Sequence, residues 1–462
     1  MKRNFLKTTA AVFLAAASLA ACGGGQSEST QAAGTEQSQS GQAAEAESAE
    51  EQAEASGEVV QIDFWSAPQV SQQAFWESMA EQYKEVNPNV EVTVSAMPES
   101  PSSEAGIQSA IASGTAPAAS ENVFRGFASQ LAEAQAIVPL DSFEDFDTIV
   151  SSRNMTAMMD AWKFGDGHQY VLPMFSNPSM FLWRIDLLKE LGFDAAPQTY
   201  SEVYEVGKAL KEKYPDKFVW ASSDFTNTSW YKRWWDWLTL YLAASEGNVF
   251  IENNALVADD DAAVAVYDFF DQMNKNGYLL AQETTDPFET GLALTTQFVP
   301  FRFLAMHEKY PDLKYEENYV VAAAPVPDDV PVENVKTMSD NKGVVIYSQV
   351  SEEKQKAAYE FIKWVYTDGA HDAEWMDTTN LLPAQDNLLE NEEFAALFEG
   401  SPELVPFAEN VKNAVPAIDN ADYVETHTAI GEKGLVPVLN GELTPQEAWD
   451  AVKAEIETVL QQ

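Results

Sequence analysis

After residue 59 the spacing between apolar residues changes several times along the chain. Residues 59–65 are rich in β-branched and aromatic side chains, which predicts a strand that ends before Pro68. Apolar side chains then recur four residues apart within 71–86, which predicts an amphipathic helix, and residues 90–94 alternate as a second strand. A strand, a helix and a strand in this order predict a right-handed parallel unit.

The same alternation continues to the end of the chain. Further strands are predicted at residues 122–124, 170–173, 179–183, 319–324 and 343–347. Further helices are predicted at residues 105–112, 128–134, 186–191, 203–211, 230–244, 264–274, 354–366 and 444–460. Thr199 and Glu202 have the spacing of a capping box, and Pro445 suits a first helical turn. This order predicts an α/β fold, and about 400 residues are too many for one core, so two domains are expected.

The first residues have the pattern of a secretory leader. Lys2, Arg3 and Lys7 precede a short apolar stretch at residues 8–17, which is too short to cross a bilayer. Leu-Ala-Ala then leads into Cys22, the only cysteine of the chain. This spacing resembles the lipobox of bacterial lipoproteins, which implies a signal peptide at 1–21 and a lipid-anchored Cys22. The alternative is an ordinary cysteine near a signal-peptide cleavage site.

The segment at residues 22–58 has the composition of a tether. After Cys22 it consists mostly of Gln, Ser, Ala, Glu and Gly, with eight glutamates and no lysine, arginine or aromatic residue. Such a segment cannot bury enough apolar surface to offset its ordering entropy, so a disordered acidic tether is predicted. An anchor, a tether and a globular body describe a protein that works just outside a membrane.

The charge of the chain excludes some partners. The formal net charge is −46, whereas nucleic acids and anionic lipids attract basic surfaces, so neither is expected to bind the body directly. A solubilising surface accounts for this charge, and attraction of a cationic ligand is the alternative. The body has no cysteine and therefore folds without disulfides.

The sequence shows no pattern typical of a catalytic or metal site. The four histidines are scattered without metal-ligand spacing, and the acidic run at 259–261 lacks the spacing of a calcium loop. There is no glycine-rich phosphate loop and no serine elbow. We therefore predict no enzyme activity, no catalytic residue, no metal and no cofactor.

Aromatic side chains are the best candidates for binding. An indole ring stacks on the apolar face of a sugar while polar side chains bond its hydroxyl groups. On a helix, Trp230, Trp234 and Trp237 share one face and Tyr231 and Trp235 share another, and at least one face must pack as core. We predict that Trp230, nearest the helix start, reaches a ligand, although core packing is the alternative for each ring.

Other candidate residues stand at strand ends or near the crossing between the two domains, where ligands bind in open α/β sheets. They are Trp65 and Ser66, Phe124 and Arg125, Phe175 and Asn177, and Asp340 and Asn341. We predict that Trp65 and Trp230 face each other across a cleft.

Several segments resemble, in the same order along the chain, segments of the extracellular solute-binding proteins of ABC transporters, in the sugar-binding family that includes maltose-binding protein. The matching segments are Ile62-Asp63-Phe64-Trp65-Ser66, Ser113-Gly114, Val138-Pro139-Leu140-Asp141, Ile185-Asp186-Leu187, Pro325-Val326-Pro327 and Leu382-Pro383-Ala384. The chain departs from the family pattern at Ala118, and at Phe298, Phe301 and Arg302, where a Gly-x-Trp is frequent. Because such positions often line the cleft, Phe298 and Arg302 join the predicted site.

The resemblance implies a two-lobed, type II periplasmic-binding-protein-like fold with a hinge between the lobes. One lobe is predicted at residues 59–173 and 325–380 and the other at 174–324 and 381–462. The implied function is a lipid-anchored, monomeric binding component of an ABC importer, outside the cytoplasm, which delivers a carbohydrate to a membrane permease. The alternatives are a binding protein for an acidic, phosphorylated or cationic small molecule, an anchored glycan hydrolase, and a surface adhesin. An acidic ligand would be held by Arg125 and Arg302.

Overall fold

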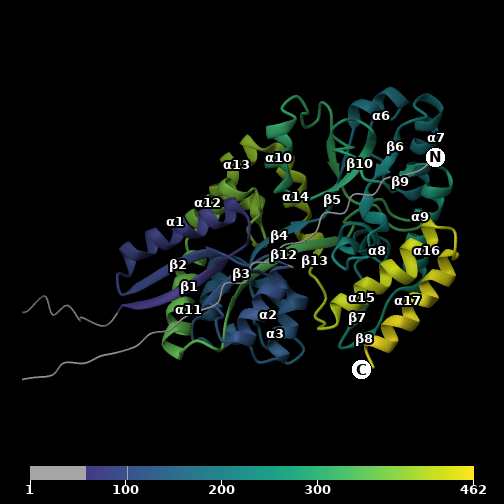
Figure 1. Ribbon diagram of the computed structural model, residues 1–462. Coiled ribbons are helices and arrows are strands. Elements are labelled where there is room, and N and C mark those ends of the chain that lie inside the picture. Colours follow the sequence, from purple (N-terminus) through teal and green to yellow (C-terminus); the bar gives the residue numbers. More distant parts are fainter. Residues whose placement is uncertain (1–58, 101, 462) are drawn as a thin grey trace, which may run out of the picture. The chain divides into compact units, whose positions relative to one another are not determined.

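The computed structural model describes residues 59–100 and 102–461, which form one compact unit. The predicted leader, Cys22 and the tether lie outside the described residues. The described part contains two large sheets and one two-stranded sheet, with helices packed around them (Figure 1). The predicted α/β class is therefore confirmed.

The first sheet has the strand order β13-β12-β3-β1-β2, and β4 also pairs with β12. Its strands are β1 (Val60–Ser66), β2 (Val90–Ala96), β3 (Ala119–Val123), β4 (Leu172–Pro178), β12 (Thr337–Ile346) and β13 (Ala414–Val415). β1 runs parallel to β2, with Val60 opposite Val90, and parallel to β3. The parallel unit predicted at the start of the body is therefore confirmed.

The second sheet has the strand order β11-β5-β10-β6-β9. Its strands are β5 (Met180–Trp183), β6 (Phe218–Ala221), β9 (Leu279–Leu280), β10 (Ala293–Phe298) and β11 (Val320–Ala322). β10 runs parallel to β6, and β5 pairs antiparallel with both β10 and β11. The small sheet pairs β7 (Ile251–Glu252) with β8 (Ala255–Leu256).

Helices occupy most of the remaining chain. Those of the first half are α1 (Val70–Val86), α2 (Ser103–Ser113), α3 (Arg125–Glu133), α4 (Phe146–Ser152), α5 (Thr156–Asp160), α6 (Ile185–Leu191), α7 (Tyr200–Lys213) and α8 (Thr239–Ala244). Those of the second half are α9 (Asp260–Lys275), α10 (Arg302–Lys309), α11 (Glu352–Tyr366), α12 (Gly369–Thr379), α13 (Ala395–Gly400), α14 (Val405–Asn410), α15 (Tyr423–Ala429), α16 (Val436–Leu439) and α17 (Pro445–Val459). Two π-helices lie at Trp234–Leu238 and Ile430–Leu435. Short 3-10 helices lie at Leu140–Ser142, Ser223–Thr226, Leu388–Glu390, Glu392–Phe394, Pro402–Leu404 and Val411–Asn413.

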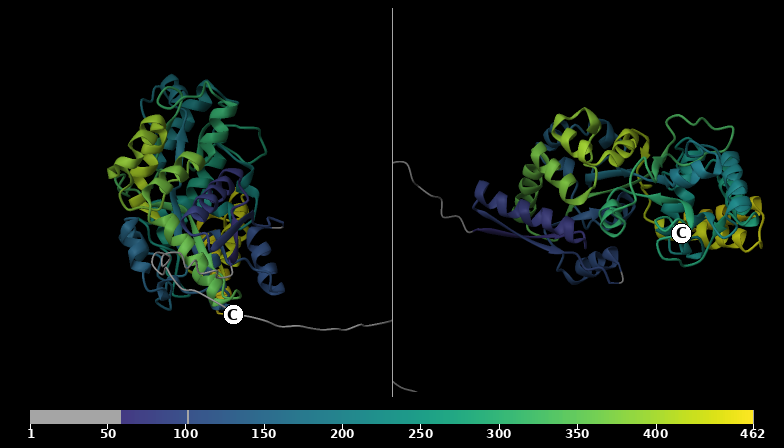
Figure 2. Two further views of the ribbon diagram at one scale, coloured as in Figure 1. Left: turned by 90° about the vertical axis from the view of Figure 1, so that its left-hand side faces the viewer. Right: turned by 90° about the horizontal axis from the view of Figure 1, so that it is seen from above.

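Buried aromatic rings join helices to the first sheet and join other helices to one another. Phe64 on β1 packs 4.3 Å from Trp76 on α1 and 5.9 Å from Phe361 on α11, between ring centroids. In the other group of helices, Trp237 stacks on Tyr241 and lies near Trp449 of α17. The right-hand view of Figure 2 separates the two groups, with α1 and α11 in one and the yellow C-terminal helices, which pack on α9, in the other.

The boundaries of the strongest elements agree with the sequence pattern. Thr199 accepts a hydrogen bond from the Glu202 backbone N–H while the Glu202 side chain returns to the cap, so the predicted capping box is confirmed. Thr444 and Glu447 form a second capping box, and Pro445 between them is the first residue of α17. Side-chain caps of this kind satisfy N–H groups that the first helical turn leaves free.

Several elements differ from their predictions, and two of these differences have a clear physical basis. The helix predicted at 230–244 begins at Lys232 and contains a π-helix before α8, and aromatic rings pack on several sides of this segment. The strand predicted at 343–347 begins already at Thr337. Its first half is polar yet buried, since it pairs with β4, so a rule based on apolar alternation misses it.

Two long strands carry the chain between the sheets. β4 belongs to the first sheet and β5 to the second, and Ser179 alone separates them. The chain returns from β11 to β12, which pairs antiparallel with β4. The boundary predicted between residues 173 and 174 falls inside β4, and the division into two lobes stays a prediction.

Gly343 on β12 gives a first testable prediction, because two strands approach it closely. It pairs with both Val123 of β3 and Pro173 of β4, and an added Cβ would lie 2.2 Å from the Leu172 carbonyl oxygen. Gly343→Ala must push backbone apart, so we expect a loss of about 1–3 kcal/mol of unfolding free energy. Urea denaturation measures this loss. Gly400→Ala, where an added Cβ meets nothing, is the control, and equal stability of both variants would contradict the prediction.

Candidate binding site

The candidate site lies where parallel strands of both sheets end. Open α/β sheets bind ligands beyond the carboxyl ends of their strands, where loops leave room and polar groups converge. In the first sheet, β1 ends at Ser66 and leads into α1. In the second sheet, β6 ends at Ala221 and β10 at Phe298, and the segments that follow them line a cavity.

The first cavity, which we call the β6–β10 cavity, has a volume of about 390 Å³. Its aromatic lining includes Trp220, Trp235 and Phe301, and its polar lining includes Asp224, Asp236 and Gln297. Phe301 is 43% exposed, which is unusual for so large an apolar ring. Flat rings beside hydrogen-bonding groups are the chemistry that a molecule with apolar faces and polar edges requires.

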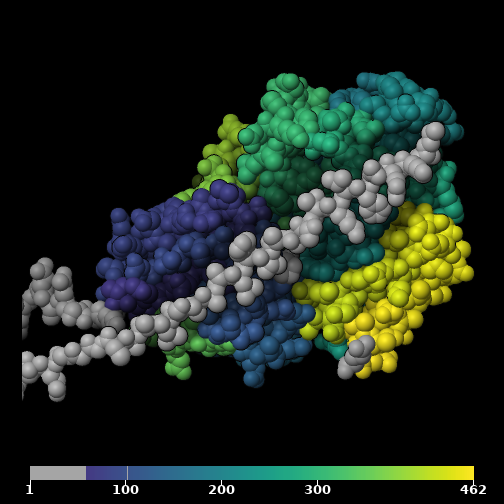
Figure 3. Space-filling model, viewed as in Figure 1, coloured from purple at the N-terminus to yellow at the C-terminus, as the bar shows by residue number. Residues whose placement is uncertain are grey.

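A second cavity shares lining residues with this one and is also lined by the start of α1. It measures about 450 Å³ and is lined by Gln69, Ser71 and Gln72 from the start of α1 and by Phe298 and residues of α10. We call it the α1–α10 cavity. Phe301 and Arg302 line both cavities. Figure 3 shows the purple α1 segment and the green segment that contains α10 next to each other on the surface.

Most charges around the cavities are paired. Asp236 accepts a hydrogen bond from Arg233 at 2.8 Å, and both side chains are buried. Burial raises the pKa of Asp236 to about 6, and the positive charge of Arg233 opposes this shift. Lys232 forms an ion pair with Asp224 at 2.8 Å, so charged groups reach the β6–β10 cavity without leaving a large excess of either sign.

Arg302 differs from these groups because it has no ion-pair partner among the described residues. Its Nη1 donates to the Gln297 carbonyl oxygen at 2.8 Å, and its guanidinium lies 4.5 Å from the centroid of the Phe298 ring. Burial lowers the pKa of Arg302, and distant carboxylates oppose this only in part. The predicted candidates Phe298 and Arg302 therefore contact each other and both line the α1–α10 cavity.

The structure brings Phe124 and Trp230 together. Their ring centroids lie 5.6 Å apart, and both rings pack against Tyr423 and Trp234. Phe124 is buried, whereas Trp230 is partly exposed. No ring contact joins Trp65 to Trp230 in the described part of the chain, so their facing arrangement stays a prediction.

Three other candidates near the first sheet have local partners. Trp65 is partly exposed at the end of β1, and Ser66 is buried with its hydroxyl near the carbonyl oxygens of Ala67 and Ser95. Arg125 donates to the Lys163 carbonyl oxygen at 2.6 Å and pairs with Asp419 at 3.5 Å. Both contacts use Nη2, and the buried Nε of Arg125 has no hydrogen-bond partner among the described residues.

The candidates on the crossing strands are buried. Phe175 stacks on Trp375 with 6.0 Å between centroids. Asn177 pairs in register with Asp340, and its Oδ1 accepts from the Leu382 backbone N–H at 3.0 Å. Burial raises the pKa of Asp340. None of these residues, nor Asn341, is among those that line the two cavities.

Sequence reasoning missed several residues that line the β6–β10 cavity. Phe301 comes three residues after the last residue of β10. Ligands often bind beyond strand ends, so a prediction of β10 would have made Phe301 a candidate. The sequence pattern did not predict β10. Trp235 was assigned to a helix face, but the π-helix turns it toward the cavity. π-helical turns are frequent at functional sites.

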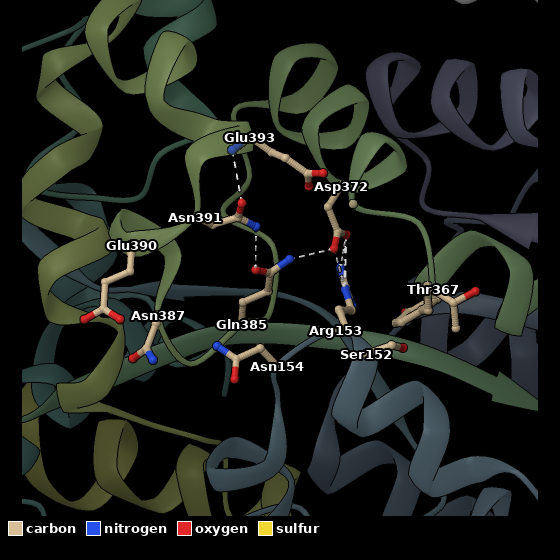
Figure 4. A pocket seen from close by; sticks show the side chains of 12 residues that line it. Ser152, Arg153, Asn154, Thr367, Asp372, Gln385, Asn387, Glu390, Asn391 and Glu393 are labelled. Carbon is tan, nitrogen blue, oxygen red and sulfur yellow. Dashed lines mark hydrogen bonds and ion pairs between the residues drawn. The ribbon is translucent and has the colours of Figure 1, made fainter.

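Figure 4 shows another polar cavity, in which lining side chains form hydrogen bonds with one another. Arg153 bonds both carboxylate oxygens of Asp372, and Gln385 donates to the same carboxylate at 2.8 Å. Asn391 continues this network to Gln385. Because the arginine is fully used and joins several elements, we assign this network to structure and not to binding.

Two features are absent from the described residues. No group of three or more His, Cys, Asp or Glu side chains there is arranged to hold a metal ion. No helix in residues 59–100 or 102–461 has both the length and the apolar character that a membrane span requires.

Comparison with known proteins gives a consistent result. Residues 78–399 match the model of the bacterial extracellular solute-binding protein family. The solved structure of uncharacterized protein lmo0859 from Listeria monocytogenes EGD-e is 49% identical, covers 87% of this chain and 100% of its own, and superposes with a TM-score of 0.82. No curated protein matches the chain.

Two more distant structures share the fold. The cyclic alpha-maltosyl-1,6-maltose binding protein from Arthrobacter globiformis is 19% identical, with a TM-score of 0.73 and coverage of 87% of this chain and 99% of its own. The sugar-binding protein MalE from Xanthomonas citri is 15% identical, with a TM-score of 0.70 and coverage of 87% and 98%. The chain therefore belongs to the bacterial extracellular solute-binding protein family.

Proposed function

We propose that this chain captures a carbohydrate and delivers it to the permease of an ABC importer. The observation that carries the proposal is the β6–β10 cavity, where Trp220, Trp235 and Phe301 adjoin Asp224, Asp236 and Gln297. A sugar ring needs an apolar surface for its C–H face and hydrogen-bonding partners for its hydroxyl groups, and this cavity supplies both.

The adjoining α1–α10 cavity supports a ligand longer than one sugar ring. It shares Phe301 and Arg302 with the β6–β10 cavity and is also lined by Gln69 and Gln72. Several proteins of the same fold bind carbohydrates, including alpha-D-tagatose in a protein from Thermotoga lettingae and maltotriose in one from Bdellovibrio bacteriovorus. An oligosaccharide that contacts residues near both sheets would favour a hinge motion that brings the two sheets closer together.

A ligand with an acidic group is the second candidate, because Arg302 lacks an ion-pair partner among the described residues. A desolvated guanidinium gains most from an anionic partner. UgpB from Mycobacterium tuberculosis, a protein of the same fold, binds glycerophosphocholine, which shows that the fold accepts a phosphate-containing solute. The acidic group would contact Arg302 where the two cavities meet.

A thermal-shift panel tests the proposal. Maltose, maltotriose, isomaltotriose and cellotriose represent neutral sugars, and galacturonic acid and glucose 6-phosphate represent acidic ones. A ligand at a hundredfold excess over its Kd adds about 2.7 kcal/mol to unfolding free energy. Stabilisation by an acidic sugar alone would favour the second candidate. Release of a shorter sugar during incubation would contradict a pure binding role.

Trp235→Ala gives a prediction for the cavity itself. Loss of a stacking ring is expected to weaken binding of the sugar found in the panel by about 1–3 kcal/mol, measured by calorimetry. The cost to folding is expected to be smaller than for Trp237→Ala, a fully buried ring whose loss costs about 3–5 kcal/mol of unfolding free energy. Unchanged affinity in Trp235→Ala together with a strongly destabilised fold would show that this ring belongs to the core and not to the binding site.

We also propose that Cys22 carries a lipid that holds the protein at the cell membrane. Cys22→Ser removes the only thiol of the chain, so we expect the protein to leave the membrane fraction and stay soluble after ultracentrifugation. Metabolic labelling with a radioactive fatty acid checks the modification directly. Membrane sedimentation of the variant at the wild-type level would show that something else anchors the protein.

A further inference from the structure

Ser179 is the single residue between β4 of the first sheet and β5 of the second. It is fully buried, and both its backbone groups bond to β12. The Ser179 N–H donates to the Met338 carbonyl oxygen at 2.9 Å, and its own carbonyl accepts from the Thr337 hydroxyl at 2.6 Å. The Ser179 backbone is therefore held by the strand that carries the chain back toward the first sheet.

The Ser179 hydroxyl, in contrast, contacts the second group of elements. Its Oγ lies 2.8 Å from Nε2 of Gln297 on β10 and 3.0 Å from Oγ1 of Thr239, the first residue of α8. Thr239 Oγ1 in turn lies 2.7 Å from the Trp234 carbonyl oxygen at the start of the π-helix. One chain of contacts thus joins β10, the connection between the sheets, α8 and the π-helix.

Donor geometry gives this chain of contacts its direction. Thr239 Oγ1 donates to Ser179 Oγ and also to the Trp234 carbonyl oxygen, so one hydroxyl serves both acceptors. Gln297 Nε2 donates to the same Ser179 Oγ. The carboxamide of Gln297 therefore presents its nitrogen to Ser179.

This direction leaves the Gln297 Oε1 as a free acceptor. Gln297 is 7% exposed and lines the β6–β10 cavity, and its Oε1 has no hydrogen-bond partner among the described residues. A nearly buried acceptor without a partner is unfavourable, whereas a ligand hydroxyl that enters the cavity could donate to it. The cavity therefore contains an acceptor of fixed orientation.

We propose that Gln297 is a specificity-determining residue that accepts a hydrogen bond from a ligand hydroxyl group, and that Ser179 is the residue that positions it. This inference rests on the proposed binding function. Because Ser179 also separates the two sheets, the same chain links the occupied cavity to the segment where the sheets can move relative to each other. It also holds the start of the π-helix, which carries Trp235 and Asp236 to the cavity.

The first experiment needs no ligand. In protein labelled with ¹⁵N-glutamine, the side-chain signal of Gln297 is identified by its absence in Gln297→Leu. We expect one Nε2 proton to exchange with solvent about tenfold more slowly than in exposed glutamines, because it is bonded to Ser179. Ser179→Ala should abolish this protection. Ser339→Ala is the matched control, since Ser339 is an equally buried serine of the crossing strands, bonded only to Ser176, and should retain it.

The second experiment uses each sugar of the panel above as the probe. For any probe that binds, Ser179→Ala and Gln297→Leu should each weaken binding about three- to tenfold, the range of one net hydrogen bond, while Ser339→Ala stays within twofold. Absence of binding by every probe would overturn the carbohydrate proposal alone. Fast exchange of the Gln297 amide in the wild type, or protection that survives Ser179→Ala, would overturn the positioning role.

Discussion

Replacing Arg153 by methionine is expected to lower the free energy of unfolding by about 3–5 kcal/mol, the usual cost of leaving a buried charge without its partner. Arg153 and Asp372 are each 2% exposed, and their closest contact is 2.5 Å. In Arg153→Met the Asp372 carboxylate stays buried with Gln385 as its remaining side-chain donor. Chemical denaturation followed by tryptophan fluorescence measures the loss.

The position of Arg153 explains why the loss should be large. Its Nη1 and Nη2 also donate to the carbonyl oxygens of Pro173 and Met174, each at 2.8 Å, and its guanidinium lies 4.2 Å from the centroid of the Tyr366 ring. Pro173 and Met174 belong to β4, the strand that leads to the second sheet. One buried side chain thus fixes the start of the crossing strand.

Two further variants separate the charge effect from packing. Arg153→Met combined with Asp372→Leu removes both charges, so it should be clearly more stable than Arg153→Met alone. Lys433→Met breaks a pair with Glu455 whose side chains are 46% and 45% exposed, and should change stability by less than about 1 kcal/mol. A double variant as unstable as the single one would show that Arg153 acts through its carbonyl bonds and not through Asp372.

The fold was predictable where local chemistry and tertiary packing agree. The helix that contains Phe75, Met79 and Tyr83 was predicted at 71–86 and begins one residue earlier, and both β1 and β2 run parallel as expected. Apolar residues four apart bury one helix face, so the same pattern that favours the helix also attaches it to the sheet. The capping box at Thr199 is equally local.

The site was harder to predict because its residues depend on the arrangement of distant segments. Phe124 was correctly placed at the end of a strand, but its contact with Trp230 depends on two segments about a hundred residues apart. Trp235 lies on a π-helix, which no 3.6-residue period reveals. Gln297 became a candidate only once Ser179 and Thr239 were seen beside it.

Glu121 is expected to reduce the stability of the body as the pH rises from about 4.5 to 7. Glu121 on β3 is fully buried, and burial raises the pKa of its carboxyl to about 7, although hydrogen bonds from Ala67 and Gln72 oppose the shift. In this pH range the unfolded chain releases the proton while the folded protein retains it, so rising pH favours unfolding. The shift corresponds to about 3 kcal/mol at most.

Glu121→Gln isolates this contribution. The neutral amide can still accept from the Ala67 N–H, now bonded at 2.7 Å, so the loop between β1 and α1 keeps its main contact. At pH 4.5 the variant and the wild type should have similar stability, and the variant should gain progressively up to pH 8. Thermal unfolding at half-unit pH steps gives the difference in stability between the variant and the wild type. Contributions from titratable groups that both proteins share cancel in this difference.

A variant with the opposite sign makes the test decisive. His427 is buried, and burial lowers its pKa to about 4, so His427 contributes a loss of stability as the pH falls from about 6.5 to 4, when the unfolded chain gains the proton first. His427→Gln should therefore gain relative to the wild type toward low pH, whereas Glu121→Gln gains toward high pH. Parallel pH profiles for the wild type and Glu121→Gln would show that Glu121 titrates near its ordinary pKa, and that Lys342, Gln72 and Ala67 compensate its burial in full.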